Sequence, residues 1–256
     1  MSEDGEMEIE LTGLLSNTTY QYRAFINAED QYYWAEETKS FTTKQAQIQL
    51  CPDDNHPHMI DLGLPSGTKW ACCNVGASKP EDYGELHAWG EVGEYWGNIS
   101  SDYEFNDHSG SFVNIGLDIA GTNYDIAHTK WGNPWRIPTK DQCEELIKNC
   151  SSMWTNQNGV NGYMFIGTNG NSIFLPAAGF RWYERTYDSL GQIGHYWSST
   201  LHEADLPNYD EQRYAYHIFF GEGVVHAESG DYRDNGNSVR PVQPDIEVAS
   251  GLRVLR

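Results

Sequence analysis

The sequence predicts an α+β protein in which short strands outnumber helices. One strong helical pattern falls at residues 139–150, where apolar residues recur at spacings of three and four. After residue 150 no helical pattern recurs, and alternating apolar runs are separated by glycine-containing turns instead. The 256-residue chain is long enough for one large domain or two, since a domain takes roughly 100–200 residues.

A separate β segment is expected at residues 1–44. Two runs, Tyr20–Ile26 and Thr38–Thr42, alternate with a period of two, which is typical of strands. The stretch LSNTTY resembles the tyrosine corner of a fibronectin type III or immunoglobulin-like domain. Such a domain needs about 100 residues, so we expect a partial β-sandwich; a hairpin belonging to the next domain is the alternative. Residues 45–57 are polar, contain two prolines and are interpreted as a linker.

The chain from Met59 onward is predicted to begin with a strand, a turn and a second strand. Pro65 and Gly67 favour the turn, because proline fixes φ and glycine accepts a positive φ. Residues 80–121 are rich in Gly, Asp and Tyr and show little periodicity, which predicts long loops.

Two helices are expected next. Residues 124–132 carry a short amphipathic pattern that ends at Gly132. The second helix begins at Thr139, which is followed by Gln142 in the spacing of a capping box. Asp141 in its first turn is favourable at the positive end of the helix dipole.

The last third of the segment is predicted to be β-structure. Asn169–Gly170 lies between two apolar runs and is a strong hairpin signal. A second pair of strands is expected around Gly221–Gly223, and NSVRPV predicts a short final strand.

Five motifs occur in one order along this segment, and together they resemble the Fibrobacter-succinogenes major paralogous domain. They read DLGLPSGTKWA, WRIPTKDQCEEL, FLPAAGFR, YWSST and NSVRPV. That family is similar to the C-type lectin fold in its formylglycine-generating-enzyme-like version. The resemblance implies a C-type lectin-like domain at residues 58–243, with two helices on mixed and antiparallel sheets, long loops, and a first strand (59–64) that pairs with the last (237–242). Residues 244–256 form a tail in this interpretation.

The C-terminal layout, GHYWSS followed by GNSVRPV, also resembles the variable proteins of diversity-generating retroelements. In those proteins the stretch between the two motifs carries the ligand-contacting positions. The resemblance implies a non-enzymatic ligand-binding module of the receptor or adhesin type. Because the family is common in secreted and surface proteins of Bacteroidetes, the expected location is extracellular, on a cell surface or on a phage particle.

Polar loops rich in tyrosine fall in the same stretch. Seven of the 16 tyrosines lie between residues 183 and 232, and tyrosine gives a large, rigid contact area at low entropic cost. The alternative is that these rings pack over a loop-rich core. For a protein or glycan ligand, the candidate binding residues are Trp182, Tyr183, Glu184, Arg185, Tyr187, Asp188, His202, Glu203, Asp205, Asn208, Tyr209, Asp210, Arg213, His226, Glu228, Asp231, Tyr232 and Asp234.

The stretch GHYWSST sets a histidine beside three hydroxyl side chains, but its spacing argues against a nucleophile and its base. His195 and Ser198 face opposite sides of a strand, and Ser199 lies about 13 Å from His195 at roughly 3.3 Å per residue. No GxSxG elbow occurs either. We therefore interpret Tyr196 and Trp197 as packing residues and predict no catalytic residue.

The five cysteines are expected to be mostly buried free thiols. Their number is odd, and no CxxC pair suggests zinc. The last of them is Cys150, so the late cysteine on which a formylglycine-generating oxidase depends is missing. An enzyme of that class is the least favoured of the functions considered.

The net charge of −21 argues against nucleic acid as a partner, because such a chain repels phosphate backbones. No apolar run approaches the roughly 18 residues of a membrane helix, and the acidic first ten residues do not resemble a secretory signal. No twelve-residue calcium loop occurs, so we expect neither a metal nor another cofactor. The alternative function is a structural or tip subunit of a bacterial surface appendage.

Overall fold

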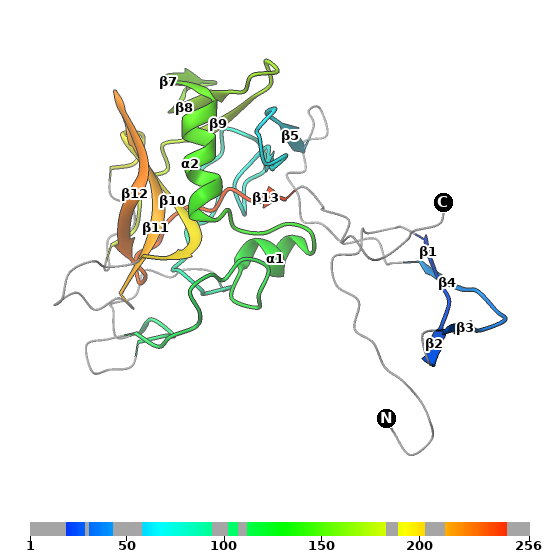
Figure 1. The fold of residues 1–256 in the computed structure, drawn as a ribbon. Helices are drawn as coiled ribbons and strands as arrows, with labels where there is room; N and C mark the ends of the chain where they lie inside the picture. The colour runs from blue at the N-terminus through cyan, green and yellow to red at the C-terminus, as the bar shows by residue number, and fades with distance from the viewer. Residues whose placement is uncertain are drawn as a thin grey trace. The chain divides into compact units, whose positions relative to one another are not determined.

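The structure is a computed structural model that describes residues 19–28, 31–42, 58–93, 102–106, 112–182, 189–202 and 213–244. It contains short helices and several small antiparallel sheets, which confirms the α+β class (Figure 1). The chain divides into two compact units, residues 1–47 with 246–256, and residues 48–245. Within the described ranges, no helix is long and apolar enough to cross a membrane.

The first unit contains four short strands in two antiparallel pairs. The pairs are β1 (Thr19–Tyr22) with β4 (Lys39–Thr42), and β2 (Phe25–Ala28) with β3 (Gln31–Trp34). Strands are thus confirmed at both predicted runs. The rings of Phe25 and Trp34 stand 5.0 Å apart between centroids, and both are half exposed. Among the described residues these four strands pair only with one another, as in a hairpin.

The second unit opens with a three-stranded antiparallel sheet. β5 (Met59–Asp61) and β13 (Val242–Gln243) both pair with β6 (Lys69–Ala71), which lies between them. The expected direct pairing of 59–64 with 237–242 is therefore wrong. The tight turn in which Gly67 N–H donates to the Leu64 carbonyl returns the chain at once, so β6 takes the place beside β5.

Both predicted helices are confirmed, each with a side chain that caps its start. The Asp125 carboxylate accepts from the first backbone amides of α1 (Ile126–Trp131), and Gly132 follows at a φ of 72°. α2 (Lys140–Asn149) begins with the expected capping box between Thr139 and Gln142. These caps satisfy amides that have no partner within the helix.

A second antiparallel sheet follows α2 directly. It contains β7 (Ser151–Gln157), β8 (Val160–Ile166) and β9 (Ser172–Pro176) in that order. The hairpin predicted at Asn169–Gly170 is confirmed, whereas β7 is not among the predicted strands. Its signal is the pair Asn158–Gly159, which have φ values of 51° and 87° and form the two-residue turn that asparagine and glycine favour.

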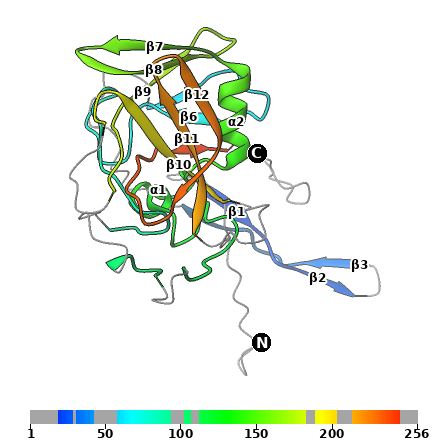
Figure 2. The same ribbon diagram turned by 90° about the vertical axis from the view of Figure 1, so that its left-hand side faces the viewer.

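The third antiparallel sheet holds the candidate site. β10 (Ile193–Leu201), β11 (Tyr214–Gly221) and β12 (Val224–Tyr232) lie side by side, as Figure 2 shows. The hairpin predicted around Gly221–Gly223 joins the last two strands. α2 contacts all three strands. Alternation predicts core positions for Tyr214, Tyr216, Ile218 and Phe220 of β11; Ile218 and Phe220 are buried, whereas the two tyrosines are half-buried.

The core of the second unit is rich in tryptophan. Trp197 is buried, as predicted, and lies with Trp135 in one cluster with α1. The described parts of residues 80–121 contain no named helix or strand, yet they bury Trp89, Tyr103 and Phe112. The four cysteines that the structure describes are buried and free, as expected.

Candidate functional site

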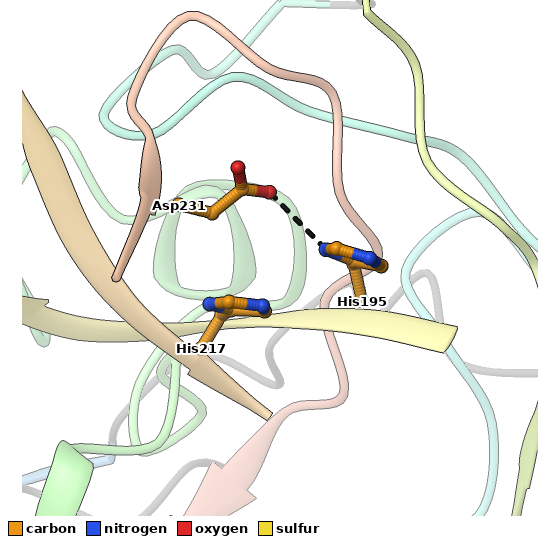
Figure 3. Close-up of side chains that lie close together, drawn as sticks. All are labelled: His195, His217 and Asp231. Atoms are coloured by element: carbon orange, nitrogen blue, oxygen red, sulfur yellow. Dashed lines mark hydrogen bonds and ion pairs between the residues drawn. The ribbon is translucent and has the colours of Figure 1, made fainter. Parts of the chain in front are cut away.

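Two histidines and an aspartate converge on one face of the third sheet. The register sets His195 of β10 opposite Phe219 of β11, and residues opposite each other share a face. His217 of β11 and Asp231 of β12 project from the same face (Figure 3). One nitrogen of each histidine and one carboxylate oxygen lie within 4.8 Å of one another. We call these three residues, His195, His217 and Asp231, the histidine cluster.

The Asp231 carboxylate is held by four hydrogen-bond donors. Its Oδ1 accepts from the backbone amide of Tyr232 at 2.8 Å and from Asn235 Nδ2 at 2.7 Å. Its Oδ2 accepts from Asn237 Nδ2 at 2.8 Å and lies 3.2 Å from His195 Nδ1. Burial raises the pKa of Asp231, but the hydrogen bond from His195 and the charge of the histidines outweigh it and lower the pKa to about 2. The group is therefore an oriented carboxylate at neutral pH.

The two ring nitrogens of His217 differ in their surroundings. Nδ1 lies 3.0 Å from the carbonyl oxygen of Ser229, which only accepts, so Nδ1 carries the hydrogen. Nε2 is buried and has no hydrogen-bond partner among the described residues. Burial lowers the pKa of His217 to about 4 against the opposing charge of Asp231. At neutral pH the ring is uncharged, and Nε2 offers a lone pair.

The His195 ring is fixed by aromatic neighbours on both of its faces. It stacks on Phe180 at 4.7 Å and on His217 at 4.9 Å between centroids, and Phe219 meets it edge-on at 5.2 Å. Its side chain is 12% exposed. His195 therefore borders the surface, while His217 lies beneath it.

The structure gives His195 an aspartate as its partner and not a serine. Ser198 and Ser199 are both buried, and the Ser198 Oγ accepts from the backbone amide of Thr200 at 3.3 Å. Tyr196 and Trp197 are buried as predicted. Within the described residues, GHYWSST is thus a core strand with one histidine turned toward β12.

Sequence reasoning included Asp231 among the ligand-binding residues but missed His195 and His217. The separations of the three residues match no metal motif, and only the strand register brings them together. One signal was present, since His217 interrupts the apolar run YAYHIFF at a position where a buried side chain is expected. Two imidazole nitrogens and a carboxylate oxygen are donors suited to a transition-metal ion.

A second group of polar and aromatic side chains lies on the opposite face of the same strands. The rings of Tyr214 and Tyr232 stand 4.5 Å apart, and His202 packs on Tyr216 at 4.4 Å between centroids. The Arg213 guanidinium lies 5.9 Å from the Tyr232 ring centre. We call these five residues the tyrosine patch. All of them are half-buried or exposed, so they form surface and not core.

The structure brings together only part of the predicted binding residues. His202, Arg213 and Tyr232 belong to the tyrosine patch, and Asp231 faces the other way because successive residues of a strand alternate. Ten lie outside the described residues: Tyr183, Glu184, Arg185, Tyr187, Asp188, Glu203, Asp205, Asn208, Tyr209 and Asp210.

Trp182 and Asp234 lie near the end of β12. Trp182 is 45% exposed and follows Arg181, whose backbone pairs with Gly236 in the turn that contains Asp234. His226 and Glu228 lie on β12 outside the tyrosine patch, and Glu228 is exposed. His226 lies opposite Phe219, and six residues separate it from Tyr232, which is roughly 20 Å of strand at 3.3 Å per residue.

Comparisons with protein-family models, with curated proteins and with solved structures found no match.

Proposed function

We propose that residues 58–243 form a C-type lectin-like scaffold that binds a ligand without chemical conversion, through the tyrosine patch and the residues 183–188 and 203–212 that adjoin it in the sequence. The observation that carries this proposal is the patch itself. Its aromatic rings and two basic side chains are gathered on β11, the end of β12 and the residues next to these strands, whereas most positions of β10 and β11 are buried. Tyrosine and arginine of this kind are the residues that dominate binding energy at protein interfaces.

The chain order around the patch supports the same interpretation. Trp182 directly precedes residues 183–188, which include two tyrosines. His202 directly precedes, and Arg213 directly follows, the polar residues 203–212. Ligand-contacting residues are often carried by loops that a rigid scaffold positions. The strands β10 and β11 supply such a scaffold, because most of their side chains are buried, on both faces of the sheet.

The expected ligand is a protein or a glycan at a cell surface. Exposed aromatic rings bind the apolar faces of sugars and of protein side chains alike, and the basic groups of His202 and Arg213 add hydrogen-bond donors. With a net charge of −21, the chain is poorly suited to nucleic acid.

The proposal is tested by binding of the full chain to a glycan array and to a panel of purified bacterial surface proteins. The double variant Arg213→Ala/Tyr232→Ala should weaken the strongest interaction at least about 30-fold, as loss of a hot spot of 2 kcal/mol implies. The matched control is His226→Ala/Glu228→Ala, which lies on the same strand outside the patch. Equal loss in both double variants would argue against the patch as the binding surface.

A structural subunit of a surface appendage is the second candidate, and the first unit favours it. Five aromatic side chains on β1, β2 and β3 expose about half of their surface: Tyr22, Phe25, Tyr32, Tyr33 and Trp34. Exposed apolar patches of this kind mark contacts with other proteins. Sedimentation of the full chain against Phe25→Ser/Trp34→Ser tests this candidate. If the chain is such a subunit, the unsubstituted chain should assemble at high concentration, and the double variant should stay monomeric.

A further inference from the structure

We propose that the histidine cluster binds one divalent transition-metal ion of the zinc class, through one ring nitrogen each of His195 and His217 and a carboxylate oxygen of Asp231. This inference goes beyond the proposed function, which requires no metal. The donors come from three adjacent strands and lie within 4.8 Å of one another (Figure 3).

The spacing of the first two donors already fits a bound ion. His195 Nδ1 and Asp231 Oδ2 stand 3.2 Å apart. Two ligands at about 2.0–2.1 Å from a tetrahedral zinc ion are about 3.3 Å apart. An ion can therefore bridge these two atoms from a position to the side of the line that joins them, in place of the hydrogen on His195 Nδ1, with little movement of either side chain.

The third donor is the atom that the protein alone leaves unsatisfied. His217 Nε2 is buried without a hydrogen-bond partner among the described residues, while Nδ1 is held by the carbonyl oxygen of Ser229. A buried polar atom without a partner costs about 1–3 kcal/mol, and most buried polar atoms in proteins avoid it. In the present conformation the carbonyl keeps the hydrogen on Nδ1, so Nε2 has its lone pair available.

The Asp231 carboxylate has an outer shell suited to a ligand. The donors Tyr232 N, Asn235 Nδ2 and Asn237 Nδ2 hold the carboxylate in place without His195. These bonds persist when the hydrogen on His195 Nδ1 is replaced by a metal ion. Outer-shell partners of this kind fix the orientation of ligating carboxylates.

Binding requires one ring to turn. The planes of His195 and His217 are 12° from parallel, so their in-plane lone pairs do not converge in the present conformation. The proposal therefore requires His217 to rotate about its Cβ–Cγ bond, a torsion that is soft in histidine, and to give up the present contact of its Nδ1 with the Ser229 carbonyl. The ion replaces the lost ring stacking with a bond to Nε2.

The donor set selects the class of ion. Calcium and magnesium take six or more oxygen ligands, whereas two imidazoles and one carboxylate suit zinc and its neighbours. Three protein ligands leave a fourth position of a tetrahedron for water or an outside group. His195 and Asp231 are each 12% exposed, so that position can be reached from their side.

The test is a calorimetric titration of Zn²⁺ into the full chain after treatment with a chelator, with Co²⁺ absorption as a second readout of tetrahedral binding. The variants are His217→Gln and Asp231→Asn. His226→Gln is the matched control, because His226 lies on the same sheet face but stacks on Phe219 outside the cluster. Circular dichroism verifies that each variant is folded.

We expect the unsubstituted chain and His226→Gln to bind one equivalent of Zn²⁺. His217→Gln and Asp231→Asn should weaken binding more than about 100-fold, beyond what the loss of an outer-shell partner costs. The proposal is overturned if the unsubstituted chain does not bind Zn²⁺. It is also overturned if all four proteins bind Zn²⁺ with equal affinity, because the thiols or surface groups then hold the ion. Should His217→Gln fail to fold, Asp231→Asn decides in the same way.

Discussion

Arg240 donates its Nε hydrogen to Oδ1 of Asn74 at 2.9 Å, across 166 residues of sequence. The same guanidinium donates to the carbonyl oxygens of Ala71, Cys72 and Phe174. NSVRPV is thereby tied to the strands of two sheets. Arginine suits this position because the planar guanidinium of Arg240 carries enough donors, in a fixed geometry, for all four buried acceptors.

Arg240→Lys is expected to destabilise the protein by about 3 kcal/mol. An ammonium on a flexible stem cannot reach Asn74 and three carbonyls together, and acceptors are left buried without donors. Urea unfolding measures the change. Leu117 provides the control, because its side chain is 69% exposed and Leu117→Ala should stay within about 0.5 kcal/mol. Equal effects of the two substitutions would contradict this role for Arg240.

Trp197→Ala should cost about 3–5 kcal/mol, because the ring is buried and leaves a cavity. Its Nε1 also donates to the His87 carbonyl at 2.7 Å, and that bond is lost. Trp182→Ala, at a ring that is 45% exposed, should leave the melting temperature nearly unchanged while it weakens ligand binding. A large loss of stability in Trp182→Ala would make that ring part of the core.

Glu85 predicts a specific pH dependence of stability. Its contact with His87 is the largest effect on the carboxyl, Lys130 adds to it, and together they lower the pKa of Glu85 from 4.5 to about 2. Because the folded-state pKa is the lower one, the stabilisation is present above about pH 4.5 and is lost as the pH falls toward 2.

The measurement compares Glu85→Gln with the unsubstituted chain in urea at pH 6.5 and pH 3. The side chain is 32% exposed, so we expect a contribution of about 1–2 kcal/mol after solvent screening. The variant should be the less stable protein at pH 6.5, and the difference should shrink at pH 3. A difference that does not change with pH would rule out this ionisation as its source.

The second unit should fold without the first. Residues 48–245 form a compact unit whose described residues contain all the buried hydrophobic clusters. A protein of these residues is expected to melt in one cooperative transition, as scanning calorimetry records. An unfolded product would mean that residues 1–47 complete its core.

Local signals predicted the elements that depend on neighbours in sequence. The capping box at Thr139 and the turn at Asn169–Gly170 are contacts between residues at most a few positions apart, and both are confirmed. Asn158–Gly159 carried an equally local signal for β7. Turn and cap chemistry is readable because it depends on few residues.

Contacts that depend on the register of strand pairing could not be predicted from such local signals. The histidine cluster depends on β10 and β12 both pairing with β11, and on a bulge that lets Ala227 and Glu228 oppose Ile218 alone. A shift of one residue in either pairing would turn Asp231 or His195 to the other face.

The central claim is that the tyrosine patch and the residues that adjoin it in the sequence bind a ligand while the buried motifs carry stability. A display library of the full chain that varies Trp182, His202, Arg213 and Tyr232 tests it most directly, with melting temperatures and selection on the glycan array for each recovered variant. The account predicts that most variants melt within a few degrees of the parent and that their binding preferences change. If most variants unfold and none binds differently, the patch is structural and the recognition function is wrong.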